Sequence, residues 1–397
     1  MMSLFQGSSQ TRSAFLFLFF LFSSFKPAQT EVVRSISDCA DFLLNQSPPE
    51  IPNILKDEAI QDQNRYKPIC QTYQNTRTFL TLYDTEEKIP VFSAIKFVQE
   101  REPGGRSKNQ KWMIEPQLEN ESADKNMKNY NEQQGTYNHQ ASNSDYTNSG
   151  YSRGHVCPRS YASTQMAKTS TFTLTNVVPQ VISFNSGSWE KMETCVKCFM
   201  EKFCKNNNGA IEGYVVAGAK PGDKKLNDRV NIPSMMWSAF CCYSSDKKAW
   251  LASAHWGYNI KEENKNVAKK KKKDKYLQTK TLNELYEKLG TVKEHFDVFP
   301  GTKCPLGTTV TEFYPDLDES CTCPPGAQRN TNKNRKNNNN KKKNRENKNI
   351  ETKNKNKENK NWKKENKNRK KENKNKNKEN KNRNKNKKRE NKKKRAG

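Results

Sequence analysis

The chain has 397 residues, 11 cysteines and a formal net charge of +29. The charge is unevenly distributed, because residues 329–397 carry +25 and residues 31–328 carry only +2. This distribution excludes a folded domain that is basic throughout, since the excess of lysine lies mainly at one end of the chain.

The first 30 residues have the pattern of a cleavable signal peptide. A polar stretch with Arg12 is followed by the apolar block AFLFLFFLFSSF at 14–25 and then by KPAQT. A helix needs about 20 apolar residues to cross a bilayer, and this block is shorter, so we expect a secreted, extracellular protein without a membrane anchor. The mature chain is predicted to begin near Glu31.

All 11 cysteines lie beyond this segment, between Cys39 and Cys323. In an oxidising compartment such cysteines form disulfides, and their odd number leaves one thiol free or paired with another chain. CVKC at 195–198 could instead be half of a zinc site, which is the less favoured interpretation. Asn45 and Asn120 are glycosylation acceptors that fit the same compartment.

Residues 31–328 are long enough to bury a core as one domain, with a cysteine-bearing part at its C-terminal end. VFSAIKFVQ at 91–99 predicts a strand, and the polar stretch 119–150 predicts a long surface loop. TFTLTNVV at 171–178 alternates well enough to predict a second strand.

The clearest periodic segment follows, because large apolar residues from Trp189 to Phe203 recur at helical spacing. Ser186 or Ser188 could cap the start of this helix. Further elements are predicted as strands at 210–219, 235–243 and 249–258 and as a helix at 281–290. The order predicts an α+β fold in which the helix packs on mixed or antiparallel strands.

The C-terminal segment repeats KENKNWK, KENKNRK, KENKNKN and KENKNRN from Lys357 to Asn384. A coiled coil needs two apolar positions in every seven, and Trp362 is the one large apolar side chain in this block. We therefore predict a disordered tail over 329–397. It is either a passive repeat or an arm that binds polyanions such as heparan chains; the basic run at 261–275 is predicted to be a solvated loop.

The sequence SRGHVCPRSYA at 152–162 places His155 beside an arginine and a glycine. Asn176, Asn185 and Glu193 follow it, and Asn185 and Glu193 could face the same strand if Asn185 opens a helix, since they are about two turns apart. Such a set could hydrolyse a phosphodiester, with an imidazole as general base, an amide oxygen on Mg²⁺ and an arginine offsetting charge. Alone, the Arg-Gly-His turn favours a structural interpretation, in which the glycine serves a turn and the histidine is a hydrogen-bonded surface residue.

The three motifs RGH, TNVVPQ and FNSGSWEKME, in this order, resemble the DNA/RNA non-specific endonuclease family. That family has a D/S-R-G-H strand, an N-x-x-P-Q segment and an F-N-x-G-x-W-x-x-x-E helix. The resemblance covers roughly residues 90–260 and implies a ββα-metal (His-Me finger) nuclease fold with DNA and RNA as substrates. PVFSAIKFV, WMIEPQLE and the many cysteines narrow it to the secreted endonuclease domain-containing 1 group.

By this resemblance each motif residue has an implied role. His155 would be the general base, and Asn185 would be the direct ligand of Mg²⁺, with Mn²⁺ as the alternative ion. Glu193 would hold metal-bound water, Asn176 would be a positioning residue, and Arg153 would contribute positive charge near the phosphate. The function implied is a secreted, metal-dependent endonuclease of low sequence specificity.

Two positions depart from the family pattern. Ser152 stands where the motif more often has aspartate, although serine also occurs there. The family places an arginine just before the tryptophan of W-x-x-x-P, whereas Trp112 follows Gln110 and Lys111, and the nearest arginine is Arg106. Reduced activity is therefore one outcome, and the alternative function is a nuclease-derived extracellular protein that binds polyanions with weak or no catalysis.

The other candidate nucleophiles and bases have structural interpretations. Cys157 could form a Cys/His pair with His155, but a disulfide is the expected state of a secreted cysteine. His255 is expected to pack within a strand. His139 and His295 have no neighbours in the sequence that suggest chemistry.

Overall fold

The computed structural model describes residues 31–105, 109–131, 137–260, 277–291, 294–317, 321 and 323. The chain divides at Gln328 and Arg329 into two units, and the described residues belong to the first. The predicted signal peptide, the basic run at 261–275 and the repeat tail lie outside the described residues. Within the described part, none of the helices combines the length and the apolar character that a membrane span requires.

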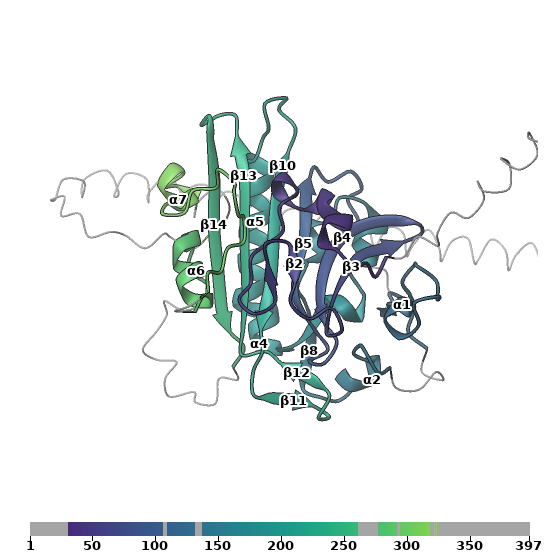
Figure 1. The fold of residues 1–397 in the computed structure, drawn as a ribbon. Helices are drawn as coiled ribbons and strands as arrows, with labels where there is room; N and C mark the ends of the chain where they lie inside the picture. Colours follow the sequence, from purple (N-terminus) through teal and green to yellow (C-terminus); the bar gives the residue numbers. More distant parts are fainter. Residues whose placement is uncertain are drawn as a thin grey trace, which may run out of the picture. The chain divides into compact units, whose positions relative to one another are not determined.

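A six-stranded sheet forms the centre of this unit, in the order β14-β13-β10-β5-β4-β3 (Figure 1). Every neighbouring pair in it is antiparallel. The strands are β3 (Tyr66–Tyr73), β4 (Thr76–Asp84), β5 (Ile89–Val98), β10 (Glu212–Lys220), β13 (Met235–Ser244) and β14 (Ala249–Tyr258). The predicted α+β fold with an antiparallel sheet is thus confirmed.

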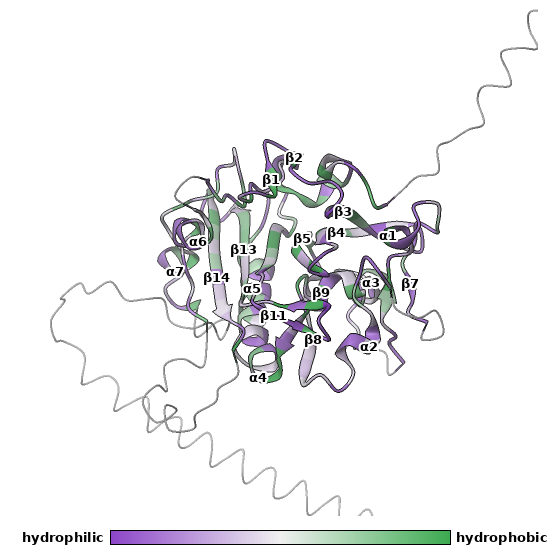
Figure 2. Cartoon of the chain, turned by 60° about the horizontal axis from the view of Figure 1, so that its bottom comes forward, coloured by the Kyte–Doolittle hydropathy of each residue, from purple (hydrophilic) through white to green (hydrophobic). Residues whose placement is uncertain are grey.

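Both faces of the sheet are covered, which explains why its central strands are apolar at successive positions and not only at alternate ones. On one face Phe240 of β13 packs against Phe199, with ring centroids 5.4 Å apart. On the other face Trp237 of the same strand packs edge-on against Phe296 at 5.3 Å. Figure 2 shows the hydrophobic colouring concentrated on central strands such as β5 and β13, whereas peripheral elements such as β7 are mostly hydrophilic.

Shorter elements complete the unit. The second face of the sheet carries η1 (Ile36–Phe42), η2 (Leu44–Gln46) and α6 (Leu282–Leu289). The remaining short elements are β1 (Leu55–Lys56), β2 (Ala59–Ile60), β6 (Met113–Ile114), α1 (Pro116–Glu119), β7 (Lys128–Asn129), α2 (Asn143–Tyr146), η4 (Arg159–Tyr161), α3 (Gln165–Ser170), η5 (Leu174–Asn176), β11 (Lys224–Leu226), β12 (Val230–Ile232) and α7 (Val310–Phe313).

The first face of the sheet carries a hairpin followed by a long helix. Strand β8 (Tyr151–His155) pairs antiparallel with β9 (Val177–Val181). The chain then continues through α4 (Ile182–Phe184) and a π-helical turn, η6 (Asn185–Trp189), into α5 (Glu190–Phe203). This is the strand, strand and helix order of the predicted ββα unit.

Asn259, just beyond β14, fastens the hairpin to the sheet. Its Nδ2 donates to the carbonyl oxygens of Pro179 (2.8 Å) and Pro233 (3.0 Å), and its Oδ1 accepts the N–H of Val181 (2.7 Å). Asn259 is buried, so these three bonds are shielded from water. The end of β9, where the helix begins, is therefore fixed relative to the edge strand β14.

Two neighbouring cysteines on β13 join opposite layers to the sheet. Cys242 pairs with Cys204, the residue that ends α5, and Cys241 pairs with Cys304 on the second face. Successive side chains of a strand point to opposite faces, so each cysteine reaches a different layer. Both layers are thereby covalently attached to one strand.

Three further disulfides involve the ends of the unit. Cys195 and Cys198 on α5 pair with Cys323 and Cys321, so the interpretation of CVKC as half of a zinc site is wrong. The remaining disulfide joins Cys39 of η1 to Cys70 of β3.

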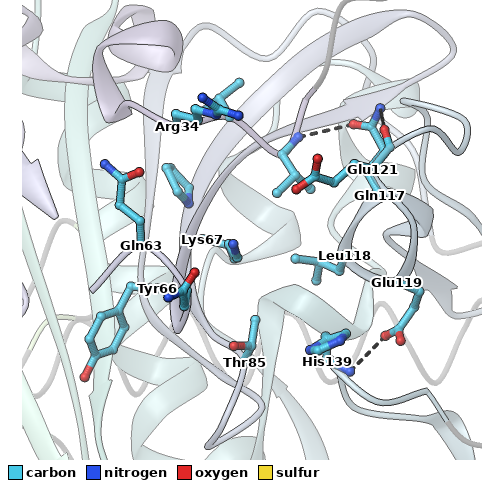
Figure 3. Close-up of a pocket in the computed structure, with 14 residues that line it drawn as sticks. Arg34, Gln63, Tyr66, Lys67, Thr85, Gln117, Leu118, Glu119, Glu121 and His139 are labelled. Atoms are coloured by element: carbon cyan, nitrogen blue, oxygen red, sulfur yellow. Dashed lines mark hydrogen bonds between the residues drawn. The ribbon is translucent and has the colours of Figure 1, made fainter. Parts of the chain in front are cut away.

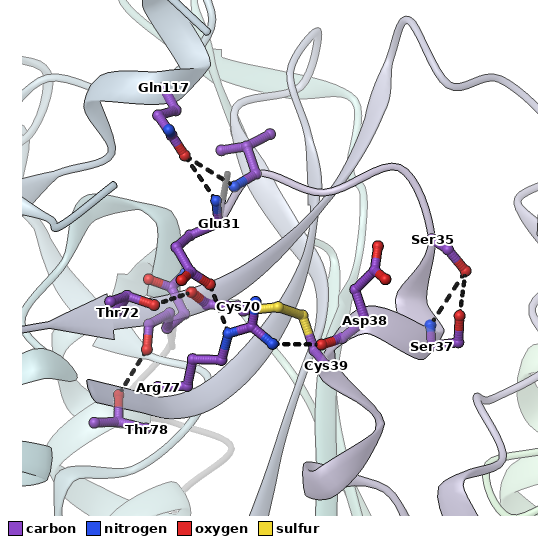
Figure 4. Close-up of a disulfide and its surroundings, with 12 residues drawn as sticks. Glu31, Ser35, Ser37, Asp38, Cys39, Cys70, Thr72, Arg77, Thr78 and Gln117 are labelled. Carbon is purple, nitrogen blue, oxygen red and sulfur yellow. Dashed lines mark hydrogen bonds and ion pairs between the residues drawn. A yellow bond between two sulfur atoms is a disulfide. The ribbon is translucent and has the colours of Figure 1, made fainter. Parts of the chain in front are cut away.

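Beside the Cys39–Cys70 disulfide, Arg77 ties the start of the described chain to the sheet (Figure 4). Its Nε donates to a carboxylate oxygen of Glu31 (2.7 Å), and its Nη1 donates to the carbonyl oxygen of Asp38 (2.6 Å). The Glu31 carboxylate is almost fully buried, so its charge is compensated by the arginine.

Cys157 is the free cysteine, and the expectation that it forms a disulfide is wrong. The other ten cysteines pair with one another in five disulfides, which leaves Cys157 as the odd thiol. It is buried, and burial raises the pKa of its thiol well above the usual range. It therefore behaves as a small apolar core residue and not as a nucleophile.

The strand predicted over 171–178 is only partly right. Residues Leu174–Asn176 form a 3₁₀ turn, and β9 begins at Val177. The alternating pattern failed because Asn176 turns its side chain inward to bond backbone groups. The helix also begins earlier than predicted, at Ile182, and Ser186 donates to the Ile182 carbonyl oxygen (2.8 Å) instead of capping the start.

The other predicted strands and the later helix agree with the structure, whereas the surface loop predicted over 119–150 is only partly right, because Gln140, Ala141 and Ser142 are fully buried. The strand at 91–99 is β5, those at 210–219, 235–243 and 249–258 are β10, β13 and β14, and the helix at 281–290 is α6. The described part of 119–150 contains two short elements, β7 and α2. Helix α2 begins with a capping box between Ser142 and Asp145.

Candidate functional site

The Arg-Gly-His motif forms the C-terminal end of strand β8, and His155 is the last residue of the strand. His155 lies opposite Val177 and Arg153 lies opposite Pro179, so these two predicted site residues share one face of the hairpin. Gly154 points to the other face, where a Cβ would lie 2.0 Å from Oε1 of Gln180. The glycine of the motif is therefore needed to let the Gln180 side chain cross the hairpin.

Asn176 fixes the backbone that follows His155. Its Oδ1 accepts the Cys157 N–H (2.9 Å) and the Ser93 hydroxyl (3.0 Å). Its Nδ2 donates to the carbonyl oxygens of Cys157 (3.0 Å) and Thr171 (3.1 Å). The side chain is fully buried and all its bonds are used, so Asn176 supports the site from behind and does not face a substrate.

The imidazole of His155 is half-buried in a corner between two aromatic rings. Its centroid lies 4.9 Å from that of Phe172, in an edge-on arrangement, and 5.5 Å from that of Trp112. Trp112 and Phe172 are themselves 5.3 Å apart. The three rings therefore form one mutually packed group.

Arg153 is held against two aromatic rings. Its guanidinium carbon lies 5.2 Å from the ring centroid of Tyr146 and 5.7 Å from that of Trp112, and its Nη2 donates to the Asn143 carbonyl oxygen (2.9 Å). Desolvation of this half-buried group lowers the pKa of Arg153 from its usual value. An arginine stays protonated all the same, so the site carries a fixed positive charge two residues before His155.

Asn185 and Glu193 lie on the helix that directly follows β9. Asn185 opens the π-helical turn, and its side chain is half-exposed. Glu193 lies in the first turn of α5, and burial of its carboxyl raises the pKa of Glu193 to about 8, an effect that Trp189 partly opposes.

A hydrogen bond and an electrostatic effect show that the first turn of α5, which contains Glu193, lies near the segment after His155. The Tyr161 hydroxyl donates to the backbone carbonyl oxygen of Glu193 (3.3 Å). In addition to burial of the thiol, the negative charge of the Glu193 carboxylate raises the pKa of Cys157. Helix α5 therefore packs against the segment that directly follows β8, which contains Cys157 and η4.

Lys111 and Arg106 are two residues that could supply positive charge before Trp112. Lys111 is exposed, and Arg106 lies outside the described residues. Ser152 lies on the opposite face of β8 from His155, across from Gln180.

The other histidines lie elsewhere. His255 is buried in β14 with Nε2 3.3 Å from the Thr279 hydroxyl, and burial lowers its pKa to about 4, so it stays neutral as a core residue, as predicted. His295 is exposed, with Nε2 3.9 Å from a carboxylate oxygen of Asp297.

His139 lines a cavity of about 610 Å³ that contains none of the predicted site residues (Figure 3). Its backbone N–H donates to the Glu119 carboxylate (3.1 Å), and Arg34 and Lys67 also line the cavity. The cavity is therefore separate from the Arg-Gly-His site.

The aromatic residues around the site were missed by the sequence reasoning. Trp112 was noted only as the start of W-x-x-x-P, and Phe172 and Tyr146 were not singled out. Their signal is weak, because an aromatic residue in a loop or short strand has no periodicity that separates a site from a core.

Glu115, three residues after Trp112, is a buried carboxyl that the predicted site does not use. Burial raises the pKa of Glu115 to about 8, a donated bond from the Thr173 hydroxyl (3.4 Å) opposes this, and the charge of Glu31 adds to it. Between about pH 4.3, the ordinary pKa of a glutamate, and pH 8, Glu115 is therefore protonated in the folded protein but ionised in the unfolded chain.

The stability contributed by this protonated carboxyl is complete below about pH 4 and falls as the pH rises toward 8, by at most about 1.4 kcal/mol per pH unit. We expect Glu115→Gln to remove this part of the pH dependence. The measurement is chemical denaturation of both proteins at pH 5 and pH 8. If both proteins lost the same unfolding free energy between pH 5 and pH 8, Glu115 would not be the group responsible.

Known nucleases are similar to this chain in sequence. A family model described as DNA/RNA non-specific endonuclease matches residues 59–303. The endonuclease domain-containing 1 protein of Homo sapiens is 31% identical over 179 residues, which is 44% of this chain and 34% of that protein. Its Mus musculus counterpart is 31% identical over 182 residues, with the same coverage.

A mitochondrial nuclease also matches over a shorter range. The Homo sapiens nuclease EXOG is 34% identical over 108 residues, or 24% of this chain and 28% of that protein. The chain thus spans about a third of the length of the curated relatives it matches. Because the family model covers more than half of the sequence, the chain belongs to the DNA/RNA non-specific endonuclease family.

Proposed function

We propose that this chain is a secreted, Mg²⁺-dependent endonuclease that hydrolyses phosphodiester bonds of DNA and RNA without sequence specificity. The observation that carries the proposal is the ββα unit, in which His155 and Arg153 share one face of β8 and Asn185 opens the π-helical turn of the helix that follows β9. Five disulfides in the described unit support secretion, since such bonds persist in oxidising compartments. The exposed Asn45 and Asn120 are the proposed glycosylation positions.

The donor set fits a hydrated Mg²⁺, with Mn²⁺ as the alternative. No cluster of three or more His, Cys, Asp or Glu side chains suited to a metal occurs in the described part of the chain. Mg²⁺ keeps most of its waters and often takes only one or two protein oxygens, so the half-exposed amide of Asn185 would suffice as a direct ligand, with Glu193 behind it. When bound, the cation supplies Lewis-acid stabilisation of charge on the phosphoryl and leaving oxygens.

The side chains of the chain itself account for the proton and charge steps. His155 would take a proton from the attacking water, and Glu193 would orient water by accepting hydrogen bonds. Arg153 would offset negative charge that develops on the phosphate. Asn176 would keep the end of β8 in place through its four bonds. Since these groups engage phosphate and water, the base sequence is not read.

The decisive test is incubation of the purified full-length protein with plasmid DNA and with RNA, each with Mg²⁺, with Mn²⁺ or with EDTA. We expect cleavage of both nucleic acids in the presence of metal and none with EDTA. A folded protein that binds DNA or heparin but cleaves neither nucleic acid would instead be the alternative, a nuclease-derived polyanion-binding protein.

The basic tail is proposed to act as an electrostatic tether that is separate from catalysis. Residues 329–397 carry +25 and the preceding domain only +2. Because lysine and arginine release counterions when they neutralise phosphates, binding through the tail should weaken steeply as salt rises. Truncation after Gly326 should therefore weaken binding to long DNA or heparin at low salt and flatten the salt dependence.

The matched measurement is turnover of a short oligonucleotide at saturating concentration, which should change little on truncation. His155, Asn185 and Glu193 all remain in the shortened chain. Identical salt slopes for the two proteins would rule out the tether and favour a passive repeat. Loss of turnover in a folded truncated protein would show instead that the tail takes part in the site.

A further inference from the structure

Trp112 is held rigidly although it lies outside the central sheet. Its carbonyl oxygen accepts the Tyr130 N–H (2.8 Å), and the N–H of the next residue, Met113, donates to the Phe172 carbonyl oxygen (2.8 Å). Met113 also pairs with Asn129 across β6 and β7 and forms a parallel bridge to Thr173. The backbone on both sides of the indole is therefore fixed to segments that adjoin the site.

The indole of Trp112 contacts both functional side chains of β8. Its ring centroid is 5.5 Å from that of His155 and 5.7 Å from the guanidinium carbon of Arg153. Phe172 also packs against the imidazole, with centroids 4.9 Å apart, and the ring centroid of Tyr146 lies 5.2 Å from the guanidinium carbon. The Trp112 ring thus packs against both the imidazole of His155 and the guanidinium of Arg153.

The imidazole needs such a contact because its second side-chain torsion is intrinsically broad, with no sharply preferred ring orientation. Packing must then select the orientation in which a ring nitrogen can reach a water. An error of about 1 Å in the position of a catalytic group can cost about 10²-fold in rate. A ring that fixes His155 would therefore act on turnover more than on substrate binding.

We propose that Trp112 is a positioning residue that fixes the ring of His155 and the guanidinium of Arg153 relative to each other, an inference that rests on the proposed nuclease function. The indole itself would touch neither substrate nor metal. It acts through His155, whose ring it packs against, and through Arg153, whose charge it holds on the same face of the hairpin.

The test uses Trp112→Leu, which keeps an apolar side chain but removes the ring, and Trp112→Phe, which keeps a smaller ring. We expect Trp112→Leu to lower kcat by about 10- to 10²-fold with little change in KM, and Trp112→Phe to recover most of the loss. Trp250→Leu is the matched control, since Trp250 is a half-buried tryptophan of β14 that packs on the second face of the sheet. It should leave kcat unchanged.

A second readout does not depend on activity. The ring currents of Trp112 and Phe172 should displace the ring-proton shifts of His155 in the NMR spectrum from those of an exposed histidine, and the signals can be assigned by their loss in His155→Ala. In Trp112→Leu the His155 signals should move, whereas those of His255 should stay. If the wild-type protein does not cleave nucleic acid, the proposed function fails while the ring shifts still test the positioning. Unchanged kcat in an active Trp112→Leu protein, or unchanged His155 shifts, would overturn the inference.

Discussion

Replacing His155 with alanine is expected to lower the turnover of phosphodiester cleavage by about 10²- to 10⁴-fold, the usual contribution of a general base. No other described histidine could take over the role of the base. His255 is buried in β14, and His139 and His295 are exposed away from the hairpin. The measurement is single-turnover cleavage of a short oligonucleotide at saturating Mg²⁺.

The control for this experiment is His295→Ala, which removes an exposed histidine that lies near Asp297. Its turnover should equal that of the wild-type protein. The fold of His155→Ala should persist, because Asn176 and not the imidazole bonds the backbone that follows β8. A folded His155→Ala protein with wild-type turnover would remove this histidine from the mechanism.

Asn185→Ala is expected to abolish cleavage at ordinary Mg²⁺ concentrations, since Asn185 is proposed as the single direct protein ligand. Raising the Mg²⁺ concentration should restore part of the activity if weakened metal binding is the defect. Glu193→Gln should be milder, because it keeps a polar side chain of the same shape next to the site. The measurement is turnover as a function of Mg²⁺ concentration for the three proteins.

Asn208→Ala provides the matched control for the metal experiment, because Asn208 is an exposed asparagine in the turn after α5. It should follow the wild-type Mg²⁺ dependence. Normal cleavage by Asn185→Ala at ordinary Mg²⁺ would show that the metal site has been assigned to the wrong residue.

The sequence predicted the parts of the fold that have strong periodicity. The helix through Trp189 and Phe203, the strands β10, β13 and β14 and the ββα order of the site all follow from residue spacing or from the motifs around His155. Strands β3 and β4 were not predicted, although they form one edge of the sheet. Their residues are buried on both faces and include polar side chains such as Gln71 and Thr81, so the alternation that marks a strand is absent.

The support of the site is harder to predict than its motif residues. Asn176 was predicted as a positioning residue from the resemblance, but its four bonds depend on the Cys157 and Thr171 backbone and on Ser93, which come from different segments. The packing of Trp112 against His155 likewise joins residues 43 positions apart. Such contacts arise from tertiary packing, and spacing within one segment carries no information about them.

The adjacent cysteines of β13 bear on how the chain reaches this structure. A slip of one residue in the pairing of β13 would exchange the faces to which Cys241 and Cys242 point. The thiol of Cys242 would then turn away from Cys204 on α5, and that of Cys241 would turn away from Cys304, so neither native bond could close. Oxidation during maturation thus selects the correct register, because it closes both disulfides of the correctly paired strand, whereas the thiols of a slipped strand stay unbonded and the strand can pair again.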